Sequence, residues 1–198
     1  MVKSGLSNDI TVSHYRLSAH LSVAILIISS IFWLIKNAST NSNKVFFNFN
    51  KRNAPFLILI LLIFIQIIIG AFVSGLDAGK IYQTWPLMGK NYFPNDLTID
   101  NLKSIIELDN HSLVQFYHRN TAYLIILYTL ILTIFIYKKR LTNLATPLKI
   151  VLFILLLQII LGIYTLVSGL NIYLASLHQI TSVLLVFSAL NLYYFRAN

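Results

Sequence analysis

The sequence predicts an all-α polytopic membrane protein with five transmembrane helices. The 198 residues are 57% hydrophobic and only 11% charged, which lies outside the usual range of a soluble domain. The chain also contains five apolar runs of about the twenty residues that cross a bilayer as a helix. These runs are Tyr15–Ile35, Ala54–Leu76, Val114–Tyr137, Pro147–Val167 and Ile172–Phe195.

The distribution of charge between alternate loops predicts how these helices are oriented. One side of the membrane receives basic residues and no acid, and the other receives all six acids. The basic side is expected to face the cytoplasm or the matrix. The nine basic residues of that side are Lys36, Lys44, Lys51, Arg52, Lys138, Lys139, Arg140, Lys149 and Arg196. The N-terminus and the long loop 77–113 then face outward.

Two further features of the composition limit the function. The chain has no cysteine, which excludes disulfides, thiolate metal sites and cysteine nucleophiles and leaves histidine as the metal ligand to consider. The net charge of +9 is explained by the flanks of membrane spans, so we expect membrane lipid and no nucleic acid as a partner.

The second and fourth apolar runs end alike, which indicates an internal repeat. Gln66-x3-Gly70 precedes Ser-Gly-Leu at 74–76, and Gln158-x3-Gly162 precedes Ser-Gly-Leu at 168–170. Each is followed by a loop and then by a helix with a histidine in its first turns. The chain begins with Ser-Gly-Leu at 4–6 and the His20 helix, so it is expected to open in the middle of such a unit, with preceding helices absent.

Three histidines occupy equivalent places near the outer ends of their helices, namely His20, His118 and His178. Ionisable residues at membrane depth are costly and usually face a bundle interior, a cavity or a ligand. His118 and His178 lie at depths that agree to within one turn, as a bis-histidine haem site requires. Spacing alone leaves three explanations open: a haem site, a proton or ion path, and interhelical polar contacts.

Neighbouring residues suit a haem as well. Arg119 adjoins His118, and Arg16 shares a helix face with His20, so both guanidinium groups are candidates to pair with haem propionates. Glycines at 70 and 162 are expected to let a flat macrocycle approach the backbone. His14 and His111 are interpreted as ordinary surface histidines. The aromatic and proline residues at 82–88 predict that loop 77–113 is an ordered cap over the outer ends of the helices.

Several motifs, in order and at suitable spacing along essentially the whole chain, closely resemble haem A synthase of the proteobacterial and mitochondrial type. They are Val12-Ser13-His14-Tyr15-Arg16-Leu17-x2-His20-Leu21, Gly70-Ala71-Phe72-Val73-Ser74-Gly75-Leu76-Asp77-Ala78-Gly79, Tyr82-Gln83-Thr84-Trp85-Pro86-Leu87-Met88, Val114-Gln115-Phe116-Tyr117-His118-Arg119 and Leu177-His178-Gln179.

The resemblance implies a family fold of eight helices in two four-helix halves. By that resemblance, residues 54–198 are a complete C-terminal half in which His118 and His178 bind the iron of haem b. Residues 1–53 are the remnant of an N-terminal half, in which His20 is the catalytic ligand to the iron of haem O or haem A. The family reaction oxidises the C8 methyl of haem O to the formyl group of haem A, and this chain is expected to need the missing N-terminal helices for it.

The resemblance also implies partners and a location. Haem O synthase and terminal oxidase assembly are the expected pathway partners, and the missing helices are expected from a second copy or a separately encoded fragment. The expected location is the inner (plasma) membrane of a bacterium, with the mitochondrial inner membrane as the alternative. Two other functions stay open: a non-catalytic haem b-binding membrane module, and a transporter-like scaffold without haem.

Overall fold

A computed structural model describes residues 13–97 and 106–197, and five long helices make up most of this part of the chain. All five are long and apolar enough to cross a membrane, which makes this a multi-pass membrane protein. Across the described ranges there is no β-strand, only an isolated bridge between Met88 and Asn91. The helices are α1 (His14–Ser39), α2 (Ala54–Gly75), α4 (His111–Lys138), α5 (Ala145–Val167) and α6 (Ile172–Arg196).

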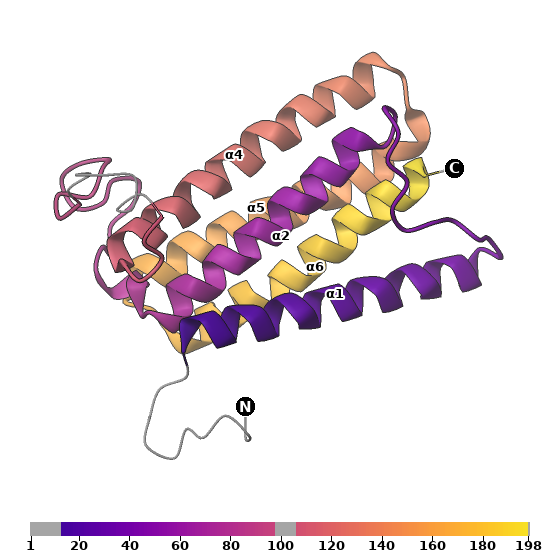
Figure 1. Ribbon diagram of the computed structural model, residues 1–198. Helices are drawn as coiled ribbons and strands as arrows, with labels where there is room; N and C mark the ends of the chain where they lie inside the picture. Colours follow the sequence, from indigo (N-terminus) through magenta and orange to yellow (C-terminus); the bar gives the residue numbers. More distant parts are fainter. Residues whose placement is uncertain (1–12, 98–105, 198) are drawn as a thin grey trace, which may run out of the picture.

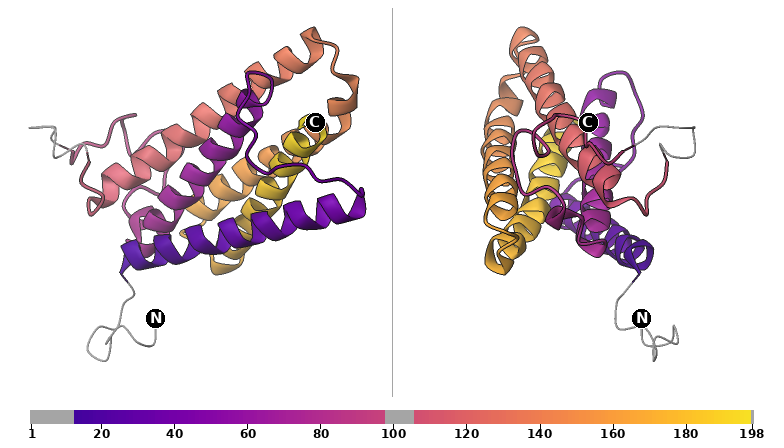
Figure 2. Two further views of the ribbon diagram at one scale, coloured as in Figure 1. Left: turned by 45° about the vertical axis from the view of Figure 1, so that its right-hand side comes forward. Right: turned by 90° about the vertical axis from the view of Figure 1, so that its left-hand side faces the viewer.

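Four of the helices form a closed ring, and the fifth packs on its outside. Going round the ring, α2 contacts α4, α4 contacts α5, α5 contacts α6, and α6 contacts α2. Helix α1 lies against α2 and α6 (Figures 1 and 2). Helices α4 and α6 are therefore diagonal partners across the ring. The first residues of α1, α4 and α6 lie at the same end of the molecule, called the outer end below.

The bundle is apolar on its surface and carries small polar side chains inside, as expected in lipid. Large exposed apolar side chains cover the outer faces, for example Leu34 at 66% exposed and Phe153 at 67%. Hydroxyl groups are buried where helices meet, including Ser18, Thr129 and Ser188. Helix association in a bilayer depends on such close packing and interhelical hydrogen bonds because lipid tails give no hydrophobic driving force.

A polar and aromatic cluster closes the inner end of the bundle, opposite the outer end. The indole of Trp33 donates to the carbonyl of Lys44 at 2.8 Å, which ties α1 to the loop that follows it. The Lys44 ammonium donates to the carbonyl of Tyr194 at 2.9 Å and lies 4.6 Å from the ring centroid of the same tyrosine. Trp33 also stacks on Tyr193. These contacts join α1 to the end of α6.

Side chains of the loop that joins α1 to α2 alternate between exposed and partly buried, and several large apolar ones are on the exposed side. Val45, Phe47 and Phe49 are exposed, at 67%, 58% and 79%, while Phe46 and Asn48 between them are partly buried. An extended chain sends successive side chains to opposite sides. Here Val45, Phe47 and Phe49 point away from the protein, whereas Phe46 packs inward against Trp33. The backbone amide of Asn48 donates to the Tyr193 hydroxyl at 3.2 Å.

The five predicted spans are confirmed, with differences at their ends. Helix α4 begins at His111, three residues before the predicted Val114, because the Asn110 side chain caps it by accepting from the backbone amide of Leu113 at 3.1 Å. Helix α1 extends to Ser39 instead of Ile35. The first Ser-Gly-Leu at 4–6 and residues 98–105 of the long loop lie outside the described residues.

Candidate functional site

His118 and His178 stand at matched depth on the two diagonal helices of the ring. His118 is the eighth residue of α4, counted from His111, and His178 is the seventh of α6, counted from Ile172. One residue of helix corresponds to about 1.5 Å. The structure therefore places the two residues predicted to share one iron at equivalent positions on diagonal helices.

Each histidine packs against the neighbouring helix in the same way. On α2, the Gln66 amide nitrogen donates to the backbone carbonyl of His118 at 3.0 Å and lies 3.4 Å from His118 Nε2. A Cβ placed on Gly70, one turn further along α2, would lie 3.1 Å from His118 Cε1. The imidazole thus fits between a glutamine and a glycine spaced four residues apart.

The second half of the molecule repeats this unit on α5 and α6. The Gln158 amide nitrogen donates to the carbonyl of His178 at 3.0 Å and lies 3.4 Å from His178 Nε2. A Cβ on Gly162 would lie 3.0 Å from His178 Cε1. The repeat found in the sequence is therefore a repeat of contacts, with one Gln-Gly-His unit built across each pair of antiparallel helices.

The glycines serve a different purpose from the one predicted. The sequence suggested that Gly70 and Gly162 let a macrocycle approach the backbone. Instead, each is covered by an imidazole ring at a distance that a methyl group would fill. Their lack of a side chain makes room for the histidines, and a haem would meet the rings and not the glycine backbone.

A bis-histidine haem fits the donor set of this site. Nδ1 of His118 and Nδ1 of His178 are buried and have no hydrogen-bond partner, which is unusual because buried polar groups are normally paired. Two neutral imidazoles at matched depth, on helices that face each other across an apolar bundle, are donors of a kind that haem iron accepts as axial ligands. Cysteine is absent from the chain, so histidine has no thiolate competitor.

Arg119 holds the outer loop in place. Its Nη1 donates to the carbonyls of Thr84 and Leu87 at 2.8 and 3.2 Å, and its Nη2 donates to the carbonyl of Tyr82 at 2.9 Å. Its Nε is buried and without a partner. The guanidinium therefore binds three carbonyls of one tight loop, and its buried Nε is left without a partner.

The predicted cap has an ordered core. The Gln115 amide also donates to the Tyr82 carbonyl, at 2.9 Å, and Met88 is almost completely buried, at 1% exposed. The Trp85-Pro86 peptide is cis. The backbone of this segment is therefore held on the outer turns of α4, while the side chains of Trp85 and Leu87 are exposed, at 45% and 41%.

His20 and Arg16 lie apart from this site. Both side chains are exposed on α1, which contacts α2 and α6 from outside the ring. They share a face as the spacing predicts, and within the described residues His20 belongs to no group of three or more potential metal-binding side chains. The structure therefore brings together one histidine pair and leaves the third histidine on the surface.

His14 differs from the surface histidine that was predicted. Its side chain is only 16% exposed, and its Nε2 lies 2.8 Å from a carboxylate oxygen of Asp109, at ion-pair distance although not aligned as a hydrogen bond. A Cβ on Gly75 would lie 2.7 Å from His14 Cβ. Helix α1 therefore meets the end of α2 backbone to backbone, and only a glycine allows this approach.

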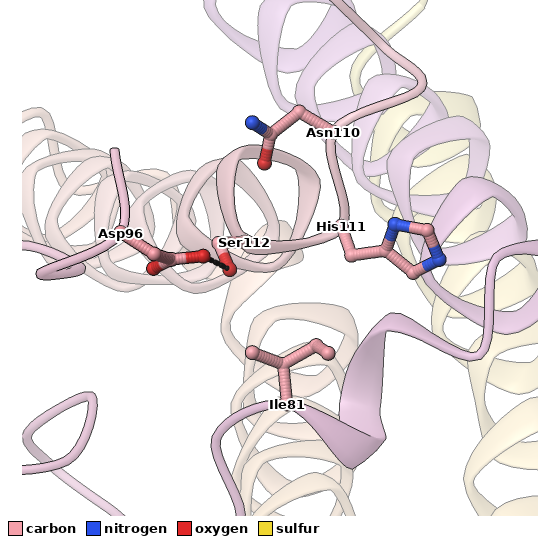
Figure 3. A pocket seen from close by; sticks show the side chains of 5 residues that line it. All are labelled: Ile81, Asp96, Asn110, His111 and Ser112. Carbon is pink, nitrogen blue, oxygen red and sulfur yellow. Dashed lines mark hydrogen bonds between the residues drawn. The ribbon is translucent and has the colours of Figure 1, made fainter. Parts of the chain in front are cut away.

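A pocket of about 300 Å³ opens at the outer end, beside the mouth of α4. Figure 3 shows Asp96 bonded to Ser112 on one side of it and His111 on the other, with Ile81 across from them. His111 is exposed, as predicted. A second pocket, of about 210 Å³, lies between α2 and α4 near Pro55 and Tyr128. His118 and His178 line neither pocket. The case for a haem therefore rests on the two histidines as ligands and not on either pocket.

The carboxylate of Asp96 connects the loop to α4. It accepts hydrogen bonds from the Tyr82 hydroxyl at 2.6 Å and from the Ser112 hydroxyl at 2.6 Å. Burial opposes the charged form, but these two hydrogen bonds outweigh it and lower the pKa of Asp96. The same bond to Asp96, followed by burial, raises the pKa of Tyr82. Sequence reasoning missed this pair because Asp96 lies in none of the motifs, although Tyr82 begins one of them.

Gln66 and Gln158 were noted in the sequence only as markers of the repeat. Their place one turn before a glycine was visible, but nothing in the sequence indicated that their amides reach a histidine on the next helix. Both histidines are also followed three residues later by a threonine, at 121 and 181, and this shared pattern could have indicated a polar contact near each histidine. Thr181 donates to the side-chain oxygen of Gln158.

Comparison with known proteins agrees with these motifs. The profile of the Cytochrome oxidase assembly protein family, COX15-CtaA, matches residues 1–190. A Heme A synthase of Pelagibacter ubique (strain HTCC1062) is 44% identical over 202 residues, covering 100% of this chain and 57% of the relative. A Heme A synthase of Rickettsia prowazekii (strain Madrid E) is 37% identical over 191 residues, covering 94% and 55%.

A Heme A synthase of Wolbachia pipientis subsp. Culex pipiens (strain wPip) is 37% identical over 190 residues, covering 96% of this chain and 56% of the relative. The chain therefore spans a little over half the length of the curated relatives it matches. No solved structure matches it. The match over residues 1–190 shows that the chain belongs to the COX15-CtaA family of cytochrome oxidase assembly proteins.

Proposed function

We propose that residues 54–198 form a haem b-binding half of a haem A synthase, with His118 and His178 as the two axial ligands of the iron. The observation that carries this proposal is the repeated unit. Gln66, Gly70 and His118 have the same mutual distances, to within 0.2 Å, as Gln158, Gly162 and His178. Two equivalent histidine environments on diagonal helices suit one symmetric pair of ligands.

The residues of the bundle account for binding and for the exclusion of water. His118 and His178 offer imidazole nitrogens from opposite sides of the ring, and the surrounding apolar helices keep water away. Arg119, with its free Nε, is placed to meet a propionate at the outer end. A haem bound there supplies reversible one-electron transfer. Holding both ligands on rigid helices fixes the spacing of the two ligands before any haem binds.

The whole reaction that we propose for the family protein is oxidation of the C8 methyl of haem O to the formyl group of haem A. In this proposal His20 is the ligand to the iron of the substrate, and Arg16 is its propionate partner. Both side chains are exposed on α1, so the substrate pocket needs a further protein surface packed against that helix. Haem O synthase and the terminal oxidase assembly pathway would supply the substrate and receive the product, in the inner membrane of a bacterium.

Visible and electron paramagnetic resonance spectra of purified residues 1–198, titrated with haem b in detergent, test the proposal. The expected result is one haem per chain with a low-spin bis-histidine signature. A bound haem that stays high-spin, or the absence of saturable binding, would overturn the assignment of the ligand pair.

A further inference from the structure

Two glutamines approach the two proposed axial histidines in the same geometry, and neither was assigned a role above. Each contacts both the backbone carbonyl and the imidazole Nε2 of its histidine. The inference below extends the proposed function, because it concerns how His118 and His178 are prepared to bind iron. It also makes a claim about the protein without haem.

The orientation of each carboxamide is fixed by chemistry. A backbone carbonyl only accepts hydrogen bonds, so the Gln atom that lies 3.0 Å from the carbonyl of His118 or His178 is the amide NH2. For Gln158 the opposite end then presents the side-chain oxygen to the Thr181 hydroxyl, and a hydroxyl can donate to it. The usual ambiguity between amide oxygen and nitrogen is therefore resolved at this site.

This orientation selects one tautomer of the imidazole. The same NH2 group lies 3.4 Å from the histidine Nε2. If Nε2 carried the proton, two donors would face each other there. If the proton sits on Nδ1, Nε2 accepts a weak hydrogen bond from the amide. Nδ1 is without a partner in both rings, so the contact at Nε2 is the interaction that distinguishes the tautomers.

We propose that Gln66 and Gln158 are positioning residues that hold His118 and His178 in the tautomer with the proton on Nδ1 and the lone pair on Nε2. That lone pair is the one that a metal takes when Nε2 is the ligand atom, and a hydrogen-bond partner commonly sets which ring nitrogen is free. The contact of the amide to Nε2 is longer and weaker than its bond to the carbonyl, so a metal ion can replace the amide at Nε2. The bond to the carbonyl keeps the glutamine and the helix register in place.

Gln66 differs from Gln158 in one respect that sharpens the inference. The side-chain oxygen of Gln66 is buried without a partner, whereas that of Gln158 is bonded to Thr181. Gln158 is therefore held from both ends and Gln66 from one. We expect the tautomer of His178 to be the more completely fixed of the two.

Nitrogen-15 NMR of histidine-labelled residues 1–198 without haem tests this directly, at a fixed pH where the imidazoles are neutral. His118→Ala and His178→Ala variants assign the signals. The expected wild-type result is the Nδ1–H form at both positions. Gln158→Leu should return His178 to a mixture while His118 stays unchanged, and Gln66→Leu should do the reverse. Gln158→Glu, whose carboxylate accepts, should move the proton of His178 to Nε2.

Gln179→Leu is the matched control, because Gln179 adjoins His178 but its side chain is exposed. With haem b added, Gln66→Leu and Gln158→Leu should bind about twofold more weakly, because about half of one histidine population then carries its proton on Nε2 and cannot bind iron there. Nε2–H histidines in the wild type, or an unchanged tautomer in both Gln158 variants, would overturn the inference. Failure of the wild type to form a low-spin haem complex would instead overturn the proposed ligand pair, whatever the NMR result.

Discussion

Arg119 Nη2 donates a hydrogen bond to the backbone carbonyl of Tyr82 at 2.9 Å, so the residue next to a proposed iron ligand also anchors the outer loop. Its Nη1 reaches two further carbonyls of the same loop. The guanidinium thus couples the position of the loop to the helix turn that carries His118. Any movement of that turn is transmitted to the aromatic segment above it.

We expect Arg119→Gln to release this loop. Hydrogen bonds to a charged donor contribute about 1.5–3 kcal/mol each, so a net loss of about 2 kcal/mol corresponds to about 30-fold faster cleavage by a protease within residues 82–88. Mass spectrometry of timed digests measures the rate, with Arg16→Gln, exposed on α1, as control. Wild-type cleavage in this segment as fast as at the chain termini would show that the loop is not a cap.

His118→Ala and His178→Ala should each abolish the low-spin haem b spectrum, because one axial imidazole is lost. The remaining haem is expected to be high-spin and weakly held. His111→Ala is the matched control, since His111 lies on the same helix but is exposed. An unchanged bis-histidine spectrum in either ligand variant would contradict the assignment.

Gly162→Ala and Gly70→Ala should disturb the imidazoles without removing them. The added methyl groups would lie 3.0 and 3.1 Å from the Cε1 atoms of the two histidines, so each ring must shift by a few tenths of an ångström. We expect about tenfold weaker haem binding and a changed electron paramagnetic resonance spectrum. Gly79→Ala, which meets only the Leu170 side chain, should leave both unchanged. Wild-type spectra from both ligand-side variants would mean that the rings adapt freely.

The contact between Asp96 and Tyr82 predicts how the loop responds to pH. The pKa of Asp96 is lowered by its hydrogen bonds, so its contribution is present above about pH 4 and is lost as the pH falls through the lowered pKa. The pKa of Tyr82 is raised, so its contribution persists to about pH 10 and is lost above the raised value.

Hydrogen exchange of residues 82–97, corrected for the intrinsic effect of pH, should therefore show a plateau of protection between these limits. Asp96→Asn removes the carboxylate, so the acid limb of the curve should flatten. An acid limb that is identical in wild type and Asp96→Asn would assign the loosening to another group.

Residues 1–198 on their own should not make haem A in cells that produce haem O and lack their own synthase. His20 is exposed on α1, and within the described residues no group of three or more metal-binding side chains forms around it. A single exposed histidine does not enclose a macrocycle. Pigment extraction and chromatography measure the product. Haem A above background would show that two copies of this chain build a pocket together.

Much of the architecture followed from the sequence because it depends on local composition. Five apolar runs of membrane length predicted five helices, and the spacing of His118 and His178 predicted that they lie at equivalent depths in their helices. The start of α4 was misjudged because the capping side chain of Asn110 and the polar first turn after it have no apolar signature. Helix ends are set by such local bonds, and hydropathy does not register them.

The interior of the site was less accessible to sequence reasoning. Contacts between Gln158 and His178 depend on which helices are neighbours and on their relative rotation. Neither can be read from the amino-acid sequence. The same holds for Arg119, because its three acceptors are backbone carbonyls. Every residue has a backbone carbonyl, so the residue types of the loop do not identify the acceptors. Side-chain to backbone bonds are thus the part of the site that only the structure supplies.

The loop between α1 and α2 bears on how the molecule sits in its bilayer. Phe47 and Phe49 project outward from this loop beside Lys51 and Arg52, and apolar side chains next to basic ones suit the boundary between acyl chains and headgroups. We expect this loop to anchor the inner end of the bundle at that boundary. Because the helices are rigid, the anchor would also set how far below the opposite surface the two histidines lie.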